Sequence, residues 1–304
     1  MKTRHLLSTA LLILLLAGAD ASPASAQKLK ASAGLQPPIA TGWMYMADDP
    51  NYDQIPSDWM EIDFTKMDVL NVGPVGIQAD GTFGLYESAA GDLATRFKWI
   101  LKTARAQNPD VKIIASQWWG DGEGTHKWGR ALSSLSVDGV GKYAQSVHDF
   151  IVSYMNESGG IDGYDIDYEG NNVTCLTAAV ISSVHAHLAA LSEANQGRRF
   201  YLTVSPADTS YLQDSVNFLD FVNMQTYAGG TGLTPESFTS MGFKSEQLLY
   251  GICPETSCFS PSVDQAESAY TDNHLAGIHV WRLNSDNYQQ EGQVQKEVYE
   301  FLHP

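Results

Sequence analysis

Three carboxylates stand at alternating positions in residues 161–170, which read IDGYDIDYEG. They are Asp165, Asp167 and Glu169, and the isoleucine and tyrosine between them favour strands. Because side chains alternate between the two faces of a strand, we expect all three carboxylates on one face. Carboxylates this close cannot all ionise without cost, so the pattern predicts a raised pKa and an acid that stays protonated near neutral pH.

Two other interpretations of these acids fit the sequence less well. An EF-hand calcium loop begins in a similar way, but its twelfth position needs a glutamate and here, counting from Asp165, it is Leu176. A solvated strand face would carry mixed charges, whereas no Lys or Arg occurs between Lys142 and Arg198. The chain also lacks Cys-x-x-Cys and His-Glu-x-x-His. We therefore favour a catalytic role, and we expect neither a metal site nor a cofactor.

The elements that must position these acids alternate regularly between strand-like and helix-like segments. Short apolar runs typical of strands occupy residues 39–46, 67–73, 111–117, 161–168, 199–205, 220–227, 247–252 and 275–281. Helical spacing of apolar residues occupies 92–105, 137–154, 176–194, 261–272 and 290–302. This alternation predicts an α/β fold, a single (β/α)8 TIM barrel over residues 39–304. If only six or seven units were real, an open doubly wound sheet would remain possible.

Barrels of this kind carry their chemistry at the C-terminal ends of the strands, and the acids end the fourth predicted strand. Gln225 and Tyr227 end the sixth strand, and Trp281 ends the eighth. Aromatic rings at a carboxylate-lined rim suit sugars, whose C–H faces stack on aromatic planes. A single aromatic residue more often packs the core, but two at separate strand ends favour a site. The histidines, including His126 and His279, form no set and are expected to be structural or surface residues.

The N-terminus reads as a secretory signal peptide over residues 1–26, followed by a linker over 27–38. We therefore expect a secreted protein, extracellular or periplasmic. Without the signal peptide, 16 basic and 34 acidic residues leave a net charge of −18. Such an acidic surface repels nucleic acid and anionic lipid, so neither nucleic acid nor a membrane is an expected partner. We also expect a monomer.

The three cysteines allow one short disulfide. Cys253 and Cys258 are five residues apart and could pair in an oxidising compartment, which leaves Cys175 unpaired. Asn156 and Asn172 begin glycosylation sequons, which matter only in a eukaryotic host.

The four acids Asp162, Asp165, Asp167 and Glu169 resemble the Asp-x-x-Asp-x-Asp-x-Glu signature of glycoside hydrolase family 18, which contains chitinases and endo-β-N-acetylglucosaminidases. The barrel rhythm extends the resemblance over most of residues 39–302. Four acids at fixed spacing on a predicted fourth strand make a specific motif. The resemblance implies a hydrolase of bonds next to N-acetylglucosamine.

Two further strand ends are similar to the family, and two depart from it. Gln225-x-Tyr227 resembles the sixth-strand pattern, and Trp281 matches the eighth-strand tryptophan that floors the sugar site. The third-strand Ser-x-Gly-Gly pattern keeps only Ser116, and Ala228 replaces the Asn or Asp usual after the tyrosine. The short chain between the seventh and eighth strands leaves no room for the small inserted domain of deep-tunnel chitinases. The resemblance then implies an open groove and endo-type cleavage.

The resemblance also implies roles for the catalytic residues. Glu169 would protonate the glycosidic oxygen, and the 2-acetamido oxygen of the sugar would attack C1 in place of a protein nucleophile. Asp167 would orient the acetamido N–H, Tyr227 would hydrogen-bond its carbonyl oxygen, and Asp165 would pair with Asp167.

The remaining positions would bind the substrate or support the acid-bearing strand. We expect Trp281, Gln225, Trp118 and Trp43 to contact the substrate, while Asp162 supports the strand. A chitinase comes first because it is the commoner activity of the family, and an endo-β-N-acetylglucosaminidase acting on N-glycans is the alternative. The expected partner is thus an N-acetylglucosamine polysaccharide or an N-glycan. A non-catalytic lectin or inhibitor on the same barrel would usually lack the acid at Glu169.

Overall fold

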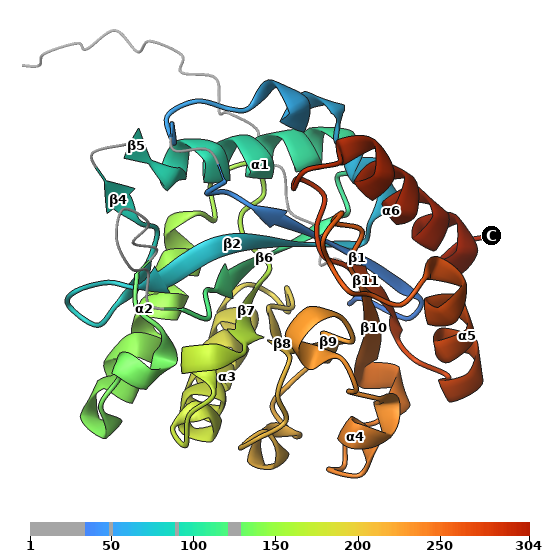
Figure 1. Ribbon diagram of the computed structural model, residues 1–304. Coiled ribbons are helices and arrows are strands. Elements are labelled where there is room, and N and C mark those ends of the chain that lie inside the picture. The colour runs from blue at the N-terminus through green and yellow to red at the C-terminus, as the bar shows by residue number, and fades with distance from the viewer. Residues whose placement is uncertain (1–33, 49–50, 89–90, 121–128) are drawn as a thin grey trace, which may run out of the picture.

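A ring of strands enclosed by helices makes up the computed structural model, which describes residues 34–48, 51–88, 91–120 and 129–304 (Figure 1). The predicted signal peptide, most of the predicted linker and His126 lie outside the described residues.

The ring is a closed barrel of parallel strands. In chain order its strands are β1 (Ile39–Tyr45), β2 (Val69–Ile77), β6 (Lys112–Gln117), β7 (Gly163–Tyr168), β8 (Tyr201–Pro206), β9 (Phe221–Met224), β10 (Leu248–Ile252) and β11 (Gly277–Val280). Each strand pairs with its neighbour in the chain, and β1 pairs with both β2 and β11, which closes the barrel. The predicted TIM barrel is therefore confirmed, and the open sheet is wrong. Three short strands decorate the barrel: β3 (Phe83–Gly84), β4 (Glu87–Ser88) and β5 (Gly91–Asp92).

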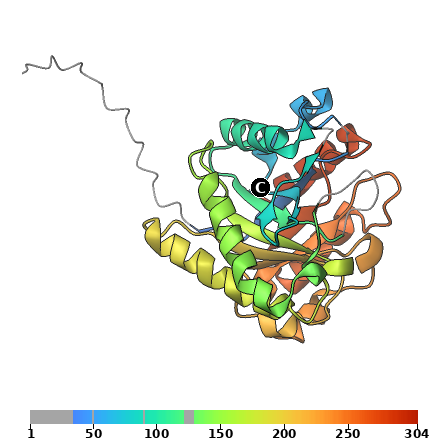
Figure 2. The ribbon, with the colours of Figure 1, turned by 90° about the vertical axis from the view of Figure 1, so that its left-hand side faces the viewer.

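Six helices cover the outside of the barrel in the described chain. They are α1 (Leu93–Gln107), α2 (Val140–Ser153), α3 (Thr177–Ala194), α4 (Pro235–Thr239), α5 (Val263–Asn273) and α6 (Tyr288–Leu302). Side chains cap several of them, as where Asp92 accepts the backbone N–H of Ala94 at the start of α1. Figure 2 shows α2 (green) and α3 (yellow) side by side on one flank.

The α-helices that would follow β1 and β8 are replaced by short 3-10 turns. The turns after β1 are Ser57–Glu61 and Phe64–Lys66, and the turn after β8 is Gln213–Ser215. After β8 the chain reaches β9 within fourteen residues, too few for a helix and two loops. Further 3-10 turns are Leu132–Ser134, Val137–Gly139, Gly170–Asn172, Ala228–Gly230 and Ser245–Gln247.

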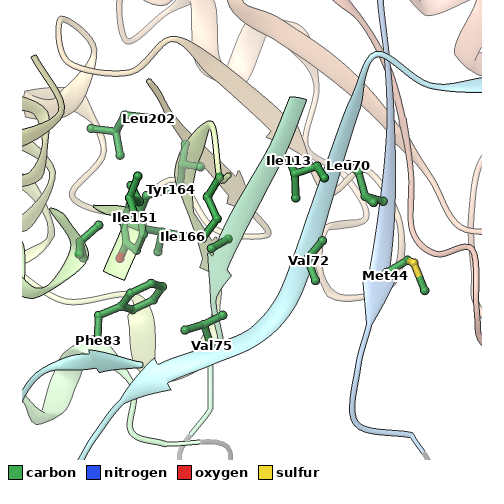
Figure 3. Close-up of a cluster of buried hydrophobic side chains, with 14 of the residues drawn as sticks. Met44, Leu70, Val72, Val75, Phe83, Ile113, Ile151, Tyr164, Ile166 and Leu202 are labelled. Carbon is green, nitrogen blue, oxygen red and sulfur yellow. The ribbon is translucent and has the colours of Figure 1, made fainter. Parts of the chain in front are cut away.

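Alternation along the strands gives the barrel two cores. Outward-facing side chains pack against the helices, among them Leu70 and Val72 of β2, Ile113 of β6, and Tyr164 and Ile166 of β7 (Figure 3). Inward-facing side chains near the N-terminal ends of the strands form a separate apolar plug, made of Ile39, Val69, Ile114, Tyr201, Leu249 and Ala276. Above the plug the interior becomes polar, and this is where the acids lie.

Two expectations about the connections are also settled. β10 and β11 are joined by residues 253–276, which contain only α5, so no inserted domain occurs between them. Cys253 and Cys258 form a disulfide in this connection, and Cys175 is free and exposed. None of the helices in the described ranges is long and apolar enough to cross a membrane.

Candidate active site

β7 carries the three predicted carboxylates to the C-terminal end of the barrel. Asp165 and Asp167 are buried inside it, and Glu169, just beyond the strand, is partly exposed at the mouth. The alternation expected from the sequence therefore holds, with Asp165 deepest and Glu169 at the rim.

Asp165 rests in a cradle of hydroxyl groups from neighbouring strands. Ser116 Oγ donates to its Oδ2 at 2.8 Å, Thr203 Oγ1 donates to its Oδ1 at 2.6 Å, and Ser205 Oγ approaches both oxygens at 3.1 and 3.2 Å. Burial raises the pKa of Asp165 to about 6, and these hydroxyl donors limit the rise. Asp165 is thus a buried carboxyl group whose pKa of about 6 lies well above the usual value for aspartate.

Asp167 and Glu169 act as a pair. Burial raises the pKa of Asp167 well above its usual range, and the charges of Glu169 and Asp165 add to the rise. Burial also raises the pKa of Glu169. The hydrogen bond between the two side chains raises the pKa of Asp167 and lowers that of Glu169, so the two carboxyl groups titrate as a pair that shares a proton. The pair therefore stores a proton at the mouth of the barrel.

Two amides fix the geometry around this pair. Gln225 Nε2 donates to Asp167 Oδ1 at 2.9 Å and to the Ser205 carbonyl at 2.8 Å. Asn172 Nδ2 donates to the carbonyls of Asp167 at 2.7 Å and Trp118 at 3.0 Å, which ties the end of β7 to the end of β6. Asn172 is fully buried, so its sequon cannot accept a glycan in the folded protein.

Tyr227, just beyond β9, lies close enough to Asp167 and Glu169 for their charges to act on it. Burial raises the pKa of its phenol well above the ordinary value, so the hydroxyl stays protonated and can donate. The ring lies 5.7 Å from that of His279, whose Nε2 donates to the Met224 carbonyl at 2.9 Å. Burial lowers the pKa of His279 to about 4, so this ring is a neutral support. A Cβ on Gly251 would lie 2.5 Å from His279 Nε2 and 2.8 Å from the Tyr227 ring, so this contact requires glycine.

The predicted aromatic residues gather at the same mouth. Trp281 is partly exposed, and its ring meets that of Trp43 edge-on at 5.1 Å. Trp43 is almost fully buried, so it lies behind Trp281 as a support. Trp118 packs on Tyr45 at 4.8 Å and remains partly exposed. These rings offer flat apolar surfaces beside a proton-storing acid pair, an arrangement that suits sugar rings.

Comparison with known proteins identifies the family. The family model described as "Glycosyl hydrolases family 18" matches residues 42–251, more than half of the 304-residue chain. The chain belongs to glycoside hydrolase family 18. No curated protein matches it significantly.

Solved family 18 structures share the fold at low identity. A chitinase from Flavobacterium johnsoniae has a TM-score of 0.62 and 17% identity, over 86% of this chain and 93% of that one. A fungal endo-β-N-acetylglucosaminidase has a TM-score of 0.58 and 17% identity, over 88% and 99%. A mutant chitinase from Cycas revoluta, in complex with (GlcNAc)4, has a TM-score of 0.61 and 14% identity, over 86% and 99%.

Sequence reasoning missed an arginine at the family 18 site. The Arg282 guanidinium lies over the rings of Tyr45 at 5.0 Å and Trp281 at 5.6 Å. Its Nε donates to Glu255 Oε1 at 2.7 Å, and its Nη1 lies 2.8 Å from Asp48 Oδ2. Glu255 belongs to the loop that the Cys253–Cys258 disulfide closes. Arg282 thus ties three segments of the rim to the aromatic floor.

The hydroxyl cradle was also missed, although one signal was present. Thr203 and Ser205 alternate along a predicted strand next to the acid-bearing one, so their side chains point into the barrel with Asp165. Asn223 Nδ2 donates to Ser205 Oγ at 3.1 Å and extends the network to β9. Inward-facing polar residues on neighbouring strands could have marked this cradle.

Asp162, the first acid of the signature, lies apart from the others at the N-terminal end of β7. It is buried, forms ion pairs with Arg105 and with Arg198 (2.9 Å), and accepts the backbone N–H of Ile113 at 2.9 Å. No group of three or more potential metal ligands occurs in the part of the chain that the structure describes.

Proposed function

We propose that this chain hydrolyses β-1,4 bonds of N-acetylglucosamine polymers, as a chitinase does. The observation that carries the proposal is the proton-storing pair of Asp167 and Glu169, which lies beside a protonated Tyr227 and an aromatic floor at Trp281. Family membership supports the same chemistry. The Cycas revoluta relative bound to (GlcNAc)4 supports this class of ligand.

In the first step Glu169 donates its proton to the glycosidic oxygen as the C1–O bond breaks. Before this step Asp167 passes the proton of the hydrogen-bonded pair to Glu169, and Asp167, now a carboxylate, turns from Glu169 to the acetamido N–H of the substrate. The 2-acetamido oxygen of the bound sugar forms the new bond to C1, which gives an oxazolinium ion and a free hydroxyl on the leaving sugar. No protein carboxylate attacks, consistent with the substrate-assisted scheme of this family.

Asp167 and Tyr227 hold the acetamido group during this step. Asp167 accepts the acetamido N–H, which gains positive charge as the ring closes. Tyr227 donates to the acetamido oxygen and aligns it with C1. Asp165 influences Asp167 through its own charge, which raises the pKa of Asp167. In the second step Glu169, now a carboxylate, removes a proton from water, and the water oxygen opens the oxazolinium ring at C1.

We propose also that the chain is exported. Support comes from the basic start, apolar run and small-residue exit of residues 1–26, and from the Cys253–Cys258 disulfide, which suits an oxidising compartment. Expression in the native host, followed by N-terminal sequencing of the mature protein, tests this. A mature start near residue 27 in the extracellular or periplasmic fraction supports export, and an intact cytoplasmic chain contradicts it.

Product analysis by mass spectrometry tests the activity. Wild type, Glu169→Gln and the exposed control Glu246→Gln are incubated with chitin hexamer and with a high-mannose glycoprotein. Shorter chitin oligomers from wild type and control, but not from Glu169→Gln, support the proposal. Release of glycan with one N-acetylglucosamine left on the protein would instead assign an endoglycosidase. Binding of chitin hexamer without any product would assign a lectin.

A further inference from the structure

The connection from β10 to α5 begins with a short loop that reaches both sides of the candidate site. We call residues 253–260 the disulfide loop, because the Cys253–Cys258 disulfide closes most of it. The loop follows β10 directly, so it lies at the same end of the barrel as the acids that end β7. All of its residues are described by the structure, and none belongs to a helix or strand.

The disulfide loop holds the sugar floor on one side. Glu255 Oε1 accepts the Nε of Arg282 at 2.7 Å, and the guanidinium lies over the ring of Trp281. The two charged side chains are only 21% and 14% exposed, so water screens this pair less than an ion pair on the open surface. The backbone N–H of Thr256 also donates to Asp286 Oδ1 at 3.4 Å. The loop is thus bonded twice to the segment between β11 and α6.

On its other side the disulfide loop reaches Tyr227. The backbone N–H of Ala228, the residue after Tyr227, donates to the Phe259 carbonyl at 2.8 Å. Burial is the main cause of the raised pKa of Tyr227, and the charge of Glu255 adds to the rise after those of the acid pair. The Glu255 carboxylate therefore lies close to the phenol. The loop spans the distance between the residue that would hold the acetamido oxygen and the arginine on the floor.

Covalent closure is the main constraint on the shape of the disulfide loop. Every residue from 254 to 260 is at least partly exposed, so packing fixes the loop only weakly. Two internal hydrogen bonds join the Cys258 N–H to the Glu255 carbonyl at 3.0 Å and the Cys253 N–H to Ser260 Oγ at 2.8 Å. The disulfide removes most other conformations of so short a loop. It thereby sets the place of Glu255, which lies between the two cysteines.

We propose that the Cys253–Cys258 disulfide positions the sugar floor, so that the oxidised protein binds chitin oligomers more tightly than the reduced protein. This inference rests on the proposed function of the site. Glu255 is the positioning residue through which the disulfide acts, because it holds Arg282 and Arg282 lies on Trp281. When the disulfide opens, Glu255 can leave Arg282, and the guanidinium loses the bond that keeps it over the ring. The acids of β7 depend on other contacts, so the chemical step should change little.

Binding in the two redox states tests this proposal. Dithiothreitol gives two electrons and two protons to the sulfur atoms of Cys253 and Cys258 and itself becomes a cyclic disulfide. The free thiols should then rise from one, Cys175, to three. Chitin hexamer is titrated into oxidised and reduced Glu169→Gln, which cannot cleave it, and tryptophan fluorescence gives the Kd. We expect a Kd about tenfold higher in the reduced protein. An equal Kd in both states overturns the proposal.

Substitutions test the same contact without a reductant. The double variant Cys253→Ser/Cys258→Ser should bind chitin hexamer as weakly as the reduced protein, whereas Cys175→Ser should match the oxidised protein. Wild-type kinetics should show the same split, with KM raised about tenfold on reduction and kcat within about threefold. Circular dichroism at the assay temperature shows that each protein is folded. A KM that stays the same while only the unfolding temperature falls would limit the disulfide to a structural role and contradict the proposal.

Two further variants show whether the effect passes through Glu255. Glu255→Ala should weaken binding in the oxidised protein as much as reduction does, and Ser257→Ala, an exposed neighbour in the same loop, should not. In Arg282→Lys, reduction should raise the Kd by less than about twofold further, because both changes remove one contact. A full tenfold increase on top of Arg282→Lys would contradict the assigned route.

The outcomes separate this inference from the proposed function. Cleavage of chitin hexamer by wild type, with equal affinity in both redox states, overturns the inference and leaves the hydrolase intact. Binding without cleavage by wild type contradicts the hydrolase, and the comparison of redox states still decides the role of the disulfide. If chitin hexamer does not bind to the oxidised protein, both are wrong.

Discussion

Carboxylates at the two ends of β7 have opposite kinds of partner. At the N-terminal end Asp162 forms ion pairs with Arg105 and Arg198. At the C-terminal end Asp165, Asp167 and Glu169 have no ion pair with any described cation, and hydroxyl groups, an amide and each other are their partners. A cation fixes the charge of a carboxylate, whereas burial without a cation leaves its proton free to move.

This contrast separates structural from chemical acids within eight residues of chain. The acids without cations make the fold less stable, because buried carboxylates close together repel each other when ionised. The acid with two cations holds β7 to its neighbours through charged contacts. Substitution of one kind of acid should therefore change activity, and substitution of the other should change stability.

Glu169→Gln should abolish activity without loss of stability. The variant cannot donate a proton, so we expect kcat on chitin hexamer to fall roughly a thousandfold. The unfolding midpoint in urea should stay the same or rise slightly, because one partly buried charge is removed. Initial rates and urea unfolding of the same preparation measure both. A rate within tenfold of wild type would show that Glu169 is not the acid.

Asp162→Asn should show the reverse pattern. Removal of this carboxylate leaves Arg105 and Arg198 without their anion, so the free energy of unfolding should fall by about 3 kcal/mol or more. The kcat of the folded fraction should be unchanged. Glu300→Gln, which breaks the exposed pair with Lys66, is the matched control and should cost less than about 1 kcal/mol. A similar loss in both variants would contradict the assigned structural role.

Asp165→Asn should change how stability depends on pH. The pKa of Asp165 in the folded protein is about 6, above its usual 3.8, so its contribution is fully present below about pH 4 and is lost as pH rises through 6. This loss amounts to about 3 kcal/mol in wild type. Urea unfolding at several pH values should show a much smaller fall in the variant. An identical fall in both proteins would mean that Asp165 does not titrate in this range.

Arg282→Lys should weaken substrate binding and leave the chemical step nearly intact. Lysine keeps the charge but cannot stack on Tyr45 and Trp281 while it bonds to Glu255. We expect KM on chitin hexamer to rise about tenfold with kcat within about threefold. The control Arg199→Lys, at the other end of the barrel, should change neither constant. If KM stays the same in Arg282→Lys, the arginine does not position the floor.

The barrel could be predicted because its signals are local. Alternating apolar residues define each strand, and the predicted strands overlap all eight observed ones. The acids share a face because their spacing matches the strand period. The sequence shows no helical spacing after β1 and β8, and the structure has only 3-10 turns there. The five-residue helix α4 was not predicted, because so short a segment carries too little apolar periodicity.

The contacts that set the pKa values and the shape of the site could not be predicted from neighbouring residues in the sequence. Ser116 and Thr203 lie 49 and 38 residues from Asp165, and only closure of the barrel brings them to it. Arg282 is 234 residues from Asp48 and meets it for the same reason.

The most direct test of the central claim compares sugars that differ at the 2-position. Hydrolysis rates are measured for chitin hexamer, its fully deacetylated form and cellohexaose with the same wild-type preparation. If the acetamido group is the nucleophile and Glu169 the acid, only chitin hexamer is cleaved, and Glu169→Gln removes that activity. Cleavage of cellohexaose as fast as chitin hexamer would contradict the substrate-assisted mechanism, and with it the role assigned to the acids at the mouth of the barrel.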